Sequence, residues 1–163
     1  MQLYLVQHGA AKNEAEDPQR RLTAEGTKTV EGIAEYLSSL RLRVDRIEHS
    51  GKERARQTAE IMAAHLRPEE GTRQVGGISP NDNVGPMRER MQNESGSLMI
   101  VGHLPYLSRL LSALLGVPQE RALVAFQIGG VVHLERHDHG EWRLRWILAP
   151  ELLTQKATQQ SAA

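Results

Sequence analysis

Two histidines follow apolar runs at widely separated places in this sequence of 163 residues, and each stands beside a glycine. His8 lies in Val6-Gln7-His8-Gly9, and His103 directly follows Val101-Gly102. An imidazole titrates near neutral pH, so it can act as a nucleophile or carry a proton. In open α/β sheets the ligand crevice lies outside the carboxyl ends of the strands, so neighbouring strands would bring both histidines to one crevice. Taken singly, either histidine could equally be a surface or capping residue.

Arginines stand near the same predicted strand ends. Arg20 and Arg21 fall in a polar stretch after the first apolar run, and Ser50-Gly51-Lys52-Glu53-Arg54 opens a predicted helix. A helix N-terminus presents backbone N–H groups to an anion, and arginine adds a forked pair of donors. Together with the two histidines, this pattern favours a site for a phosphoryl group. Arg54 alone would be interpreted as part of a solvated helix face.

Composition excludes several classes of protein. The chain has 20 basic and 20 acidic side chains, so its formal charge is zero, which argues against a general nucleic-acid binder. Cysteine is absent, which excludes disulfides, a thiolate nucleophile and cysteine-ligated metal sites. No run of about 18 apolar residues and no signal-peptide pattern occurs, so we expect a soluble cytoplasmic protein with no membrane partner. Sixteen of the basic residues are arginine, a surplus that matches habitual surface usage as well as phosphate binding.

Strands and helices are predicted to alternate over the first two thirds of the chain. Apolar runs predict buried strands at 3–6 and 98–101, and a further strand is predicted over 44–49. Apolar residues at helical spacing predict a helix from Thr23, a second helix with its stripe at 55, 59, 62 and 66, a short helix over about 84–93 and a helix over 107–114. Residues 67–86 are otherwise predicted to form loops. This order predicts one α/β domain over residues 1–153, a three-layer α/β/α arrangement with a mainly parallel central sheet. The polar segment 154–163 is predicted to fray.

The periodicity changes to two towards the C-terminus. It predicts strands over 122–128 and 131–136, joined at Gly129-Gly130, and a further strand over 142–148. We expect these strands to be antiparallel. Alternation in the last strand places Trp142 and Trp146 on one apolar face.

A local histidine cluster offers an alternative kind of site. His133, His137 and His139 lie close in sequence, with Asp138 as a further potential ligand for a metal ion. A tight polar turn at 137–140 explains the same residues, and we expect no metal site.

Four segments, in order, resemble the histidine phosphatase superfamily, whose members include phosphoglycerate mutases and acid phosphatases. Its first strand is followed by Arg-His-Gly, which here reads Gln7-His8-Gly9. The remaining three motifs are Arg-x-Leu-Thr-x-x-Gly at 20–26, Ser-x-x-x-Arg-Ala-x-Gln-Thr at 50–58, and His-Leu-Pro at 103–105. The length resembles that of the short, SixA-type phosphohistidine phosphatases. The resemblance implies a phosphoglycerate mutase-like fold over residues 1–150.

The resemblance also implies roles for individual residues. His8 would be the nucleophile that is transiently phosphorylated, while Arg20, Arg54 and His103 would bind the phosphoryl oxygens and stabilise the transferring group. Cations that hold these oxygens supply the charge stabilisation that phosphoryl transfer needs, so no metal or other cofactor is expected. Inorganic phosphate or sulfate should also bind there.

Position 7 departs from the family pattern. Glutamine keeps two N–H donors but loses the positive charge and the fork of arginine, which could cost ~10²–10³ in rate. Gln7 would then bind phosphate as a neutral donor. We hypothesise that Lys12 or Arg21 partly replaces the lost charge; the alternative is that both point to solvent.

The general acid is the second departure. Asp82, in the loop 80–84, is the best candidate, although an aspartate there also forms turns. A weak acid matters less for a phosphoramidate, because an imidazole can leave already protonated whereas an alkoxide cannot. The chain also lacks the lid insertion of larger family members, so an open crevice could admit a side chain of a whole protein.

These observations predict a phosphohistidine phosphatase that acts on a phosphorylated partner protein, such as a histidine-phosphotransfer domain. Two alternatives remain open. Gln7 is compatible with a pseudo-phosphatase that binds phosphorylated proteins or metabolites without turnover. The family also permits a phosphatase of small phosphomonoesters.

Overall fold

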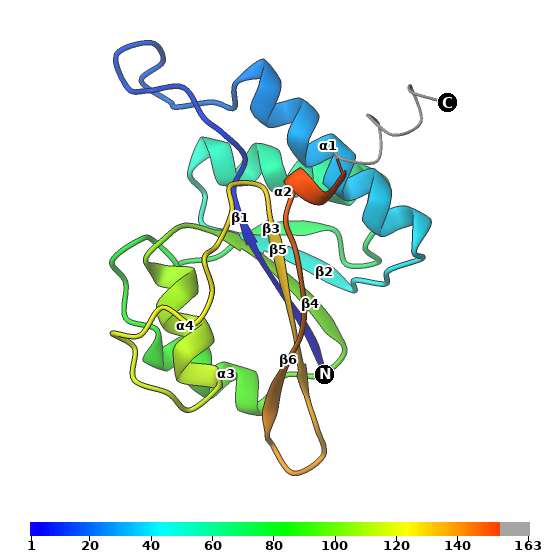
Figure 1. The fold of residues 1–163 in the computed structure, drawn as a ribbon, viewed down its shortest axis with the longest axis vertical. Helices are drawn as coiled ribbons and strands as arrows, with labels where there is room; N and C mark the ends of the chain where they lie inside the picture. Colours follow the sequence, from blue (N-terminus) through cyan, green and yellow to red (C-terminus); the bar gives the residue numbers. More distant parts are fainter. Residues whose placement is uncertain (154–163) are drawn as a thin grey trace.

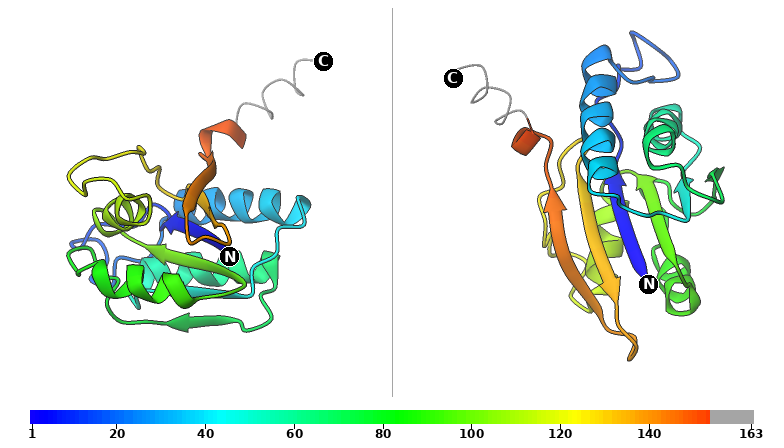
Figure 2. Two further views of the ribbon diagram at one scale, coloured as in Figure 1. Left: turned by 90° about the horizontal axis from the view of Figure 1, so that it is seen from below. Right: turned by 90° about the vertical axis from the view of Figure 1, so that its right-hand side faces the viewer.

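The central sheet has six strands in the order β3-β2-β4-β1-β5-β6, and the computed structural model describes the chain over residues 1–153. The strands are β1 (Gln2–Gln7), β2 (Arg46–His49), β3 (Thr72–Gln74), β4 (Ser97–Gly102), β5 (Val131–Arg136) and β6 (Trp142–Leu148). Strands β1 to β4 are parallel, whereas β5 is antiparallel to both of its neighbours (Figure 2). This confirms the prediction of a mainly parallel sheet with antiparallel strands at its C-terminal end. The predicted frayed segment 154–163 lies outside the described residues.

Helices cover both faces of the sheet. On one face lie α1 (Ala24–Ser39) and α2 (Glu53–Leu66), and on the other lie α3 (Gly85–Asn93) and α4 (Tyr106–Leu114) (Figure 1). Side chains of β1 alternate between these two cores, Leu3 and Leu5 towards α3 and α4, Tyr4 and Val6 towards α1 and α2. A central strand buried on both faces explains its uninterrupted apolar run. None of the helices within residues 1–153 has the length and apolar character needed to cross a membrane.

Strands β1 and β4 are direct neighbours. Gln7 pairs with Gly102 at the carboxyl ends of the two strands, and the backbone N–H of His8 continues the ladder to the carbonyl of Gly102 at 3.2 Å. His8 and His103 therefore leave the sheet at the same edge, as expected from their place after two buried strands.

The start of α1 fastens the loop that follows β1. Thr23 is the N-cap, as predicted, and its hydroxyl accepts a hydrogen bond from the N–H of Gly26 at 2.9 Å. A Cβ atom on Gly26 would lie 2.1 Å from the carbonyl oxygen of Ala10. Only glycine allows this approach, which accounts for the glycine of the second motif and holds the backbone just after His8 against α1.

Two predictions about strands were wrong. Residues 122–128 form a loop, not a strand, and no hairpin forms at Gly129-Gly130; that loop instead bonds to the end of β1, where Gly129 N–H donates to the carbonyl of Gln7 at 3.0 Å. The predicted loop 67–86 contains the short strand β3, which pairs with β2 although its residues are exposed. At a sheet edge, pairing with a neighbour decides the strand, so apolar periodicity is a poor guide.

The two tryptophans lie on opposite faces of the sheet, against the prediction. The register between β5 and β6 shifts between His133 and Leu134, so that Trp146 pairs with His133 but Leu144 pairs with Leu134. One residue of β6 is bulged out, and this reverses the side-chain alternation beyond it. Trp142 consequently packs in the core between the sheet and helices α3 and α4. Trp146 packs against the other core, on the face of the sheet that α1 and α2 cover.

Part of the arginine surplus serves the structure. Glu48 on β2 is fully buried and accepts hydrogen bonds from Arg46, Arg73 and Arg90 at distances from 2.6 to 3.0 Å. Burial tends to raise the pKa of this carboxyl, but the three guanidinium groups more than offset it and lower the pKa to about 2. These three arginines are therefore explained by a buried charge that must be compensated.

Candidate active site

The two histidines meet at the carboxyl edge of the sheet. The ring centroids of His8 and His103 lie 4.9 Å apart, with their planes inclined by 55°. The arrangement is the one that neighbouring strand ends predict. It places two imidazoles where both can touch one bound group.

His8 presents a defined nitrogen to the site. Its Nδ1 lies 2.7 Å from the carbonyl oxygen of Gly9, which can only accept, so Nδ1 carries the hydrogen. Nε2 then keeps its lone pair and accepts a hydrogen bond from Nε of Arg54 at 3.1 Å. Burial and the positive charges of Arg54 and Arg20 lower the pKa of His8 to about 4, against the opposing effect of the Gly9 carbonyl. His8 is therefore neutral near pH 7, and its lone pair lies on Nε2.

Ser50, a residue to which no separate role was assigned from the sequence, holds His103 in place. The ring of His103 is 2% exposed, and its Nε2 lies 2.6 Å from the hydroxyl oxygen of Ser50. Burial, and then the charges of His8, Arg54 and Lys52, lower the pKa of His103 to about 3. A phosphoryl dianion between these groups would oppose their positive charge and favour protonation of His103. The ring is thus suited to take up a proton when an anion binds.

The first turns of α2 carry Arg54 and its supports. Thr58 accepts a hydrogen bond from the N–H of Gly9 at 3.0 Å and donates one to the carbonyl of Arg54 at 2.7 Å. Gln57 accepts from the N–H of Leu22 at 2.8 Å. Spacings of three and four residues from Arg54 put both side chains on the face that meets the loop after β1. The third motif therefore fixes Arg54 relative to His8.

Arg20 reaches the site from the loop between β1 and α1, which rises from the same edge of the sheet (Figure 1). Its backbone adopts a left-handed conformation with φ of 51°, and its N–H donates to the carbonyl of Asp17 at 2.7 Å. The buried carboxylate of Asp17 also accepts from the N–H groups of Gln19 and Arg21. Asp17 was not singled out from the sequence, because an aspartate before proline in a polar stretch signals only a loop.

An open cleft adjoins these groups. Its volume is about 330 Å³, and Arg20, Lys52 and Arg54 line it together with Glu14 and Glu53. Arg54 lines this cleft and also donates to Nε2 of His8, so the cleft adjoins that nitrogen through Arg54. The predicted cationic site at the strand ends is thus assembled from the loop after β1 and from the start of α2.

Lys12 and Arg21, the two residues suggested to compensate for Gln7, both interact with Asp17. The guanidinium of Arg21 contacts Asp17 at 3.3 Å and Gln19 at 2.5 Å. The charge of Lys12 helps to lower the pKa of Asp17, and neither cation is among the groups that shift the pKa of His8 or His103. The structure therefore does not support the compensation hypothesis for Lys12 or Arg21. Gln7 has a buried side-chain oxygen with no hydrogen-bond partner within residues 1–153.

Asp82 occupies a turn and lines a different cavity from the cationic cleft. Its carboxylate accepts from the N–H of Ser79 at 2.7 Å, and it lines a separate cavity of about 450 Å³ with Asn83 and Arg90. Its negative charge, after burial, contributes to raising the pKa of Tyr106 to about 12. The turn-forming interpretation of Asp82 therefore has structural support, and its role as an acid stays a prediction.

The histidines at positions 133, 137 and 139 do not come together around one point. His133 stacks on Tyr4 with centroids 4.6 Å apart, and its Nε2 lies 2.5 Å from the side-chain oxygen of Gln2. His137 pairs with Glu135 at 3.4 Å and opens the turn before Gly140. Over residues 1–153, no three histidine or acidic side chains lie where they could hold a metal ion together.

The low pKa of His8 leads to the first prediction. As the pH falls, this imidazole should stay neutral through pH 5 and gain a proton only near pH 4. Titration of the histidine ring protons by NMR, with His8→Ala for assignment, measures the midpoint. A midpoint near the ordinary value of about 6.5 would show that His8 is not buried among cations.

Comparisons with known proteins identify related sequences and a related fold. A family model described as the histidine phosphatase superfamily (branch 1) matches residues 3–74. The chain is 34% identical over 122 residues to an uncharacterised protein of Picosynechococcus sp., covering 70% of this chain and 73% of that protein. It is 26% identical over 155 residues to the phosphohistidine phosphatase SixA of Escherichia coli, covering 92% and 94%. A solved structure of the protein histidine phosphatase SixA complexed with tungstate has the same fold, with a TM-score of 0.83 at 23% identity over 94% of this chain and 99% of that one.

Proposed function

Because the chain belongs to the histidine phosphatase superfamily, we propose that it is a phosphohistidine phosphatase, which removes a phosphoryl group from a histidine of a partner protein. The observation that carries this proposal is the tautomer of His8. Its Nε2 keeps a lone pair, because Nδ1–H is bound to the carbonyl of Gly9, and this nitrogen faces the cleft cation Arg54. A neutral imidazole with an oriented lone pair is what attack on phosphorus requires.

The reaction has two steps. Nε2 of His8 attacks phosphorus and the P–N bond to the substrate imidazole breaks. That imidazole already carries a proton on its other ring nitrogen, so it leaves as a neutral ring without a further proton donor. Water then attacks phospho-His8, which releases inorganic phosphate and restores the lone pair on Nε2. Arg54 donates to Nε2 at 3.1 Å in the free protein, so its guanidinium must first turn from the lone pair to the phosphoryl oxygens.

Arg20, Arg54 and His103 would stabilise the charge on the transferring group. Arg20 and Arg54 carry permanent charges at the cleft, and His103 can take a proton as the anion binds. Positioned donors of this kind contribute roughly 10²–10³ in rate each when they face the developing charge. Gln7 would add a neutral donor.

Two features favour phosphohistidine over a phosphate ester. Asp82, the expected acid, is bound to Ser79 in a turn, and a protonated imidazole needs less help to leave than an alkoxide. The cleft is also open, since Arg20 and its neighbours in the loop are exposed. A protein side chain could reach His8 without a lid having to close.

The pseudo-phosphatase remains the second candidate, and Gln7 is the observation that favours it. A buried glutamine oxygen without a partner stands where the family has arginine. If the missing charge is decisive, the protein would bind phosphorylated partners without turning them over.

A direct assay separates these candidates. The protein is incubated with a phosphorylated histidine-phosphotransfer domain, with phosphoramidate and with p-nitrophenyl phosphate, and phosphate release and acid-labile phosphate on the protein are measured. We expect the phosphohistidine protein to be hydrolysed at least about tenfold faster than the ester. Binding without turnover would make the protein a pseudo-phosphatase, and faster hydrolysis of the ester would make it a phosphomonoesterase.

A further inference from the structure

We propose that Lys52 binds the phosphoryl group and supplies the positive charge that glutamine at position 7 lacks. This inference rests on the proposed function and adds a binding residue to its site. It replaces the hypothesis that Lys12 or Arg21 performs this role.

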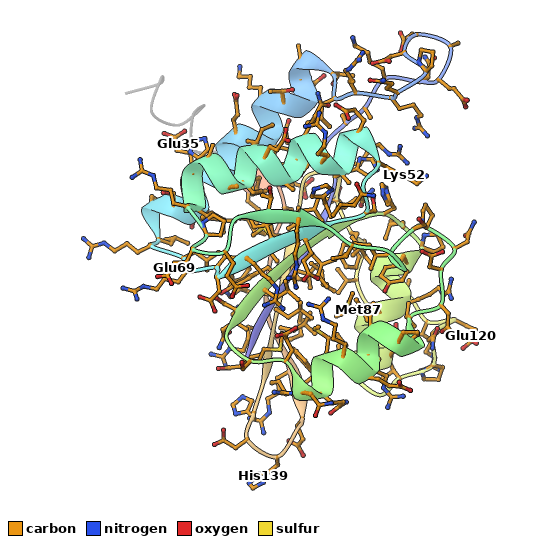
Figure 3. All side chains as sticks on the ribbon, turned by 180° about the vertical axis from the view of Figure 1, so that it is seen from behind. Glu35, Lys52, Glu69, Met87, Glu120 and His139 are labelled. Carbon is orange, nitrogen blue, oxygen red and sulfur yellow. The ribbon has the colours of Figure 1, made fainter. Side chains whose placement is uncertain are left out.

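Lys52 lies between the two residues that hold the histidines. It is the N-cap of α2, two residues after Ser50 and two before Arg54. Ser50 contacts Nε2 of His103 at 2.6 Å, and Arg54 contacts Nε2 of His8 at 3.1 Å. Figure 3 labels Lys52 at the start of α2, and its side chain lines the same cleft as Arg20 and Arg54. Lys52 therefore stands in the same cleft as the two arginines that would bind the phosphoryl group, on a flexible side chain that can turn towards an anion there.

The ammonium group is available for a ligand. The structure of residues 1–153 shows no ion pair for Lys52, whereas the neighbouring Arg56 pairs with Glu53 and Glu60. Glu53 lines the cleft but is bound to Arg56 at 2.5 Å, which leaves Glu14 as the other acidic side chain there. A cation without an internal partner in a cleft with two further cations is suited to hold an anion.

Position 7 and Lys52 both lie close to His103. Gln7 directly precedes His8 and pairs with Gly102, the residue directly before His103, so position 7 adjoins both histidines where β1 and β4 end. The charge of Lys52 contributes to lowering the pKa of His103. Lys52 therefore carries a positive charge near a histidine that also adjoins the position where Gln7 leaves none.

The test is a double-mutant cycle between Lys52→Met and Gln7→Arg. In the natural sequence, Lys52→Met should lower kcat/KM for phosphoramidate by roughly 10²-fold, the scale of one lost cationic donor. In the Gln7→Arg background the same substitution should cost less than about threefold, because the arginine then supplies the charge. An equal loss in both backgrounds, or no loss in either, would overturn the proposal.

Anion affinity tests Lys52 without any turnover. We expect Lys52→Met to weaken binding of tungstate, measured by calorimetry, by about tenfold or more, and the matched variant Lys12→Met to leave it unchanged. The midpoint of His103 in an NMR titration should also rise in Lys52→Met and stay constant in Lys12→Met. Unchanged tungstate affinity in Lys52→Met would refute the proposal whatever the activity. Weakened affinity in a protein that shows no turnover would refute the proposed function and leave the role of Lys52 intact.

Discussion

Replacing His8 by alanine is expected to abolish turnover of phosphohistidine and phosphoramidate, with a loss of roughly 10⁴-fold or more in kcat. The substitution removes Nε2, the nitrogen whose lone pair faces Arg54, and with it the covalent intermediate. The acid-labile phosphate that we expect on the natural protein after rapid quenching should then be absent. Stopped assays of phosphate release, together with mass spectrometry of the quenched protein, measure both effects.

His139→Ala is the matched control for this experiment. His139 is exposed in the turn between β5 and β6, and Figure 3 shows it at the opposite end of the molecule from Lys52. Its replacement should change neither turnover nor labelling. If His8→Ala keeps its fold by circular dichroism and still releases phosphate at more than about a tenth of the natural rate, another group is the nucleophile.

Replacing Arg54 by methionine is expected to lower kcat/KM by roughly 10²–10³-fold. Methionine keeps an unbranched apolar stem but removes the guanidinium, and with it the charge and the donor to His8. Because the charge of Arg54 helps to lower the pKa of both His8 and His103, both histidines should also titrate at a higher pH in the variant. Kinetics with phosphoramidate and NMR titration of the same sample give the two results.

Arg56→Met controls for the loss of a guanidinium from the same helix. Arg56 is two residues further along α2 and pairs with Glu53 and Glu60, away from both histidines. Its replacement should change kcat/KM by less than about threefold, in keeping with the small contribution of exposed ion pairs. Similar losses in the two variants would mean that Arg54 acts through the stability of α2, not on the phosphoryl group.

The central strands could be predicted from local pattern because their burial is nearly complete. Leu3 to Val6 and Leu98 to Val101 are apolar at every position, and both form strands buried on two faces. The predictions were wrong where hydrogen-bonded pairing between strands, and not the apolar pattern of the sequence, decides the structure. Residues 122–128 resemble a strand but have no neighbour to pair with, and a bulge in β6 sends Trp142 and Trp146 to opposite faces.

The candidate site follows the same division. Residue type and position after strands were enough to single out His8, His103 and Arg54, because the ends of parallel strands must meet at one edge. Asp17, Ser50 and Lys52 could not be assigned roles in this way. Each acts through a partner or a cleft that is distant in sequence: Ser50 on His103, Asp17 on the loop of Arg20, and Lys52 beside Arg20 and Arg54.

By itself, then, the amino-acid sequence indicated a mainly parallel sheet with antiparallel C-terminal strands, its two buried central strands and the residue types that meet at their ends, since these depend on local periodicity and on residue type. The tertiary structure alone decided which nitrogen of His8 is free, which cations lower the pKa of the two histidines, and that Arg21 is bound to Asp17. These properties arise from contacts and burial between segments far apart in the chain. Electrostatic effects fall off with distance and depend on the surrounding medium, so only the folded arrangement establishes them.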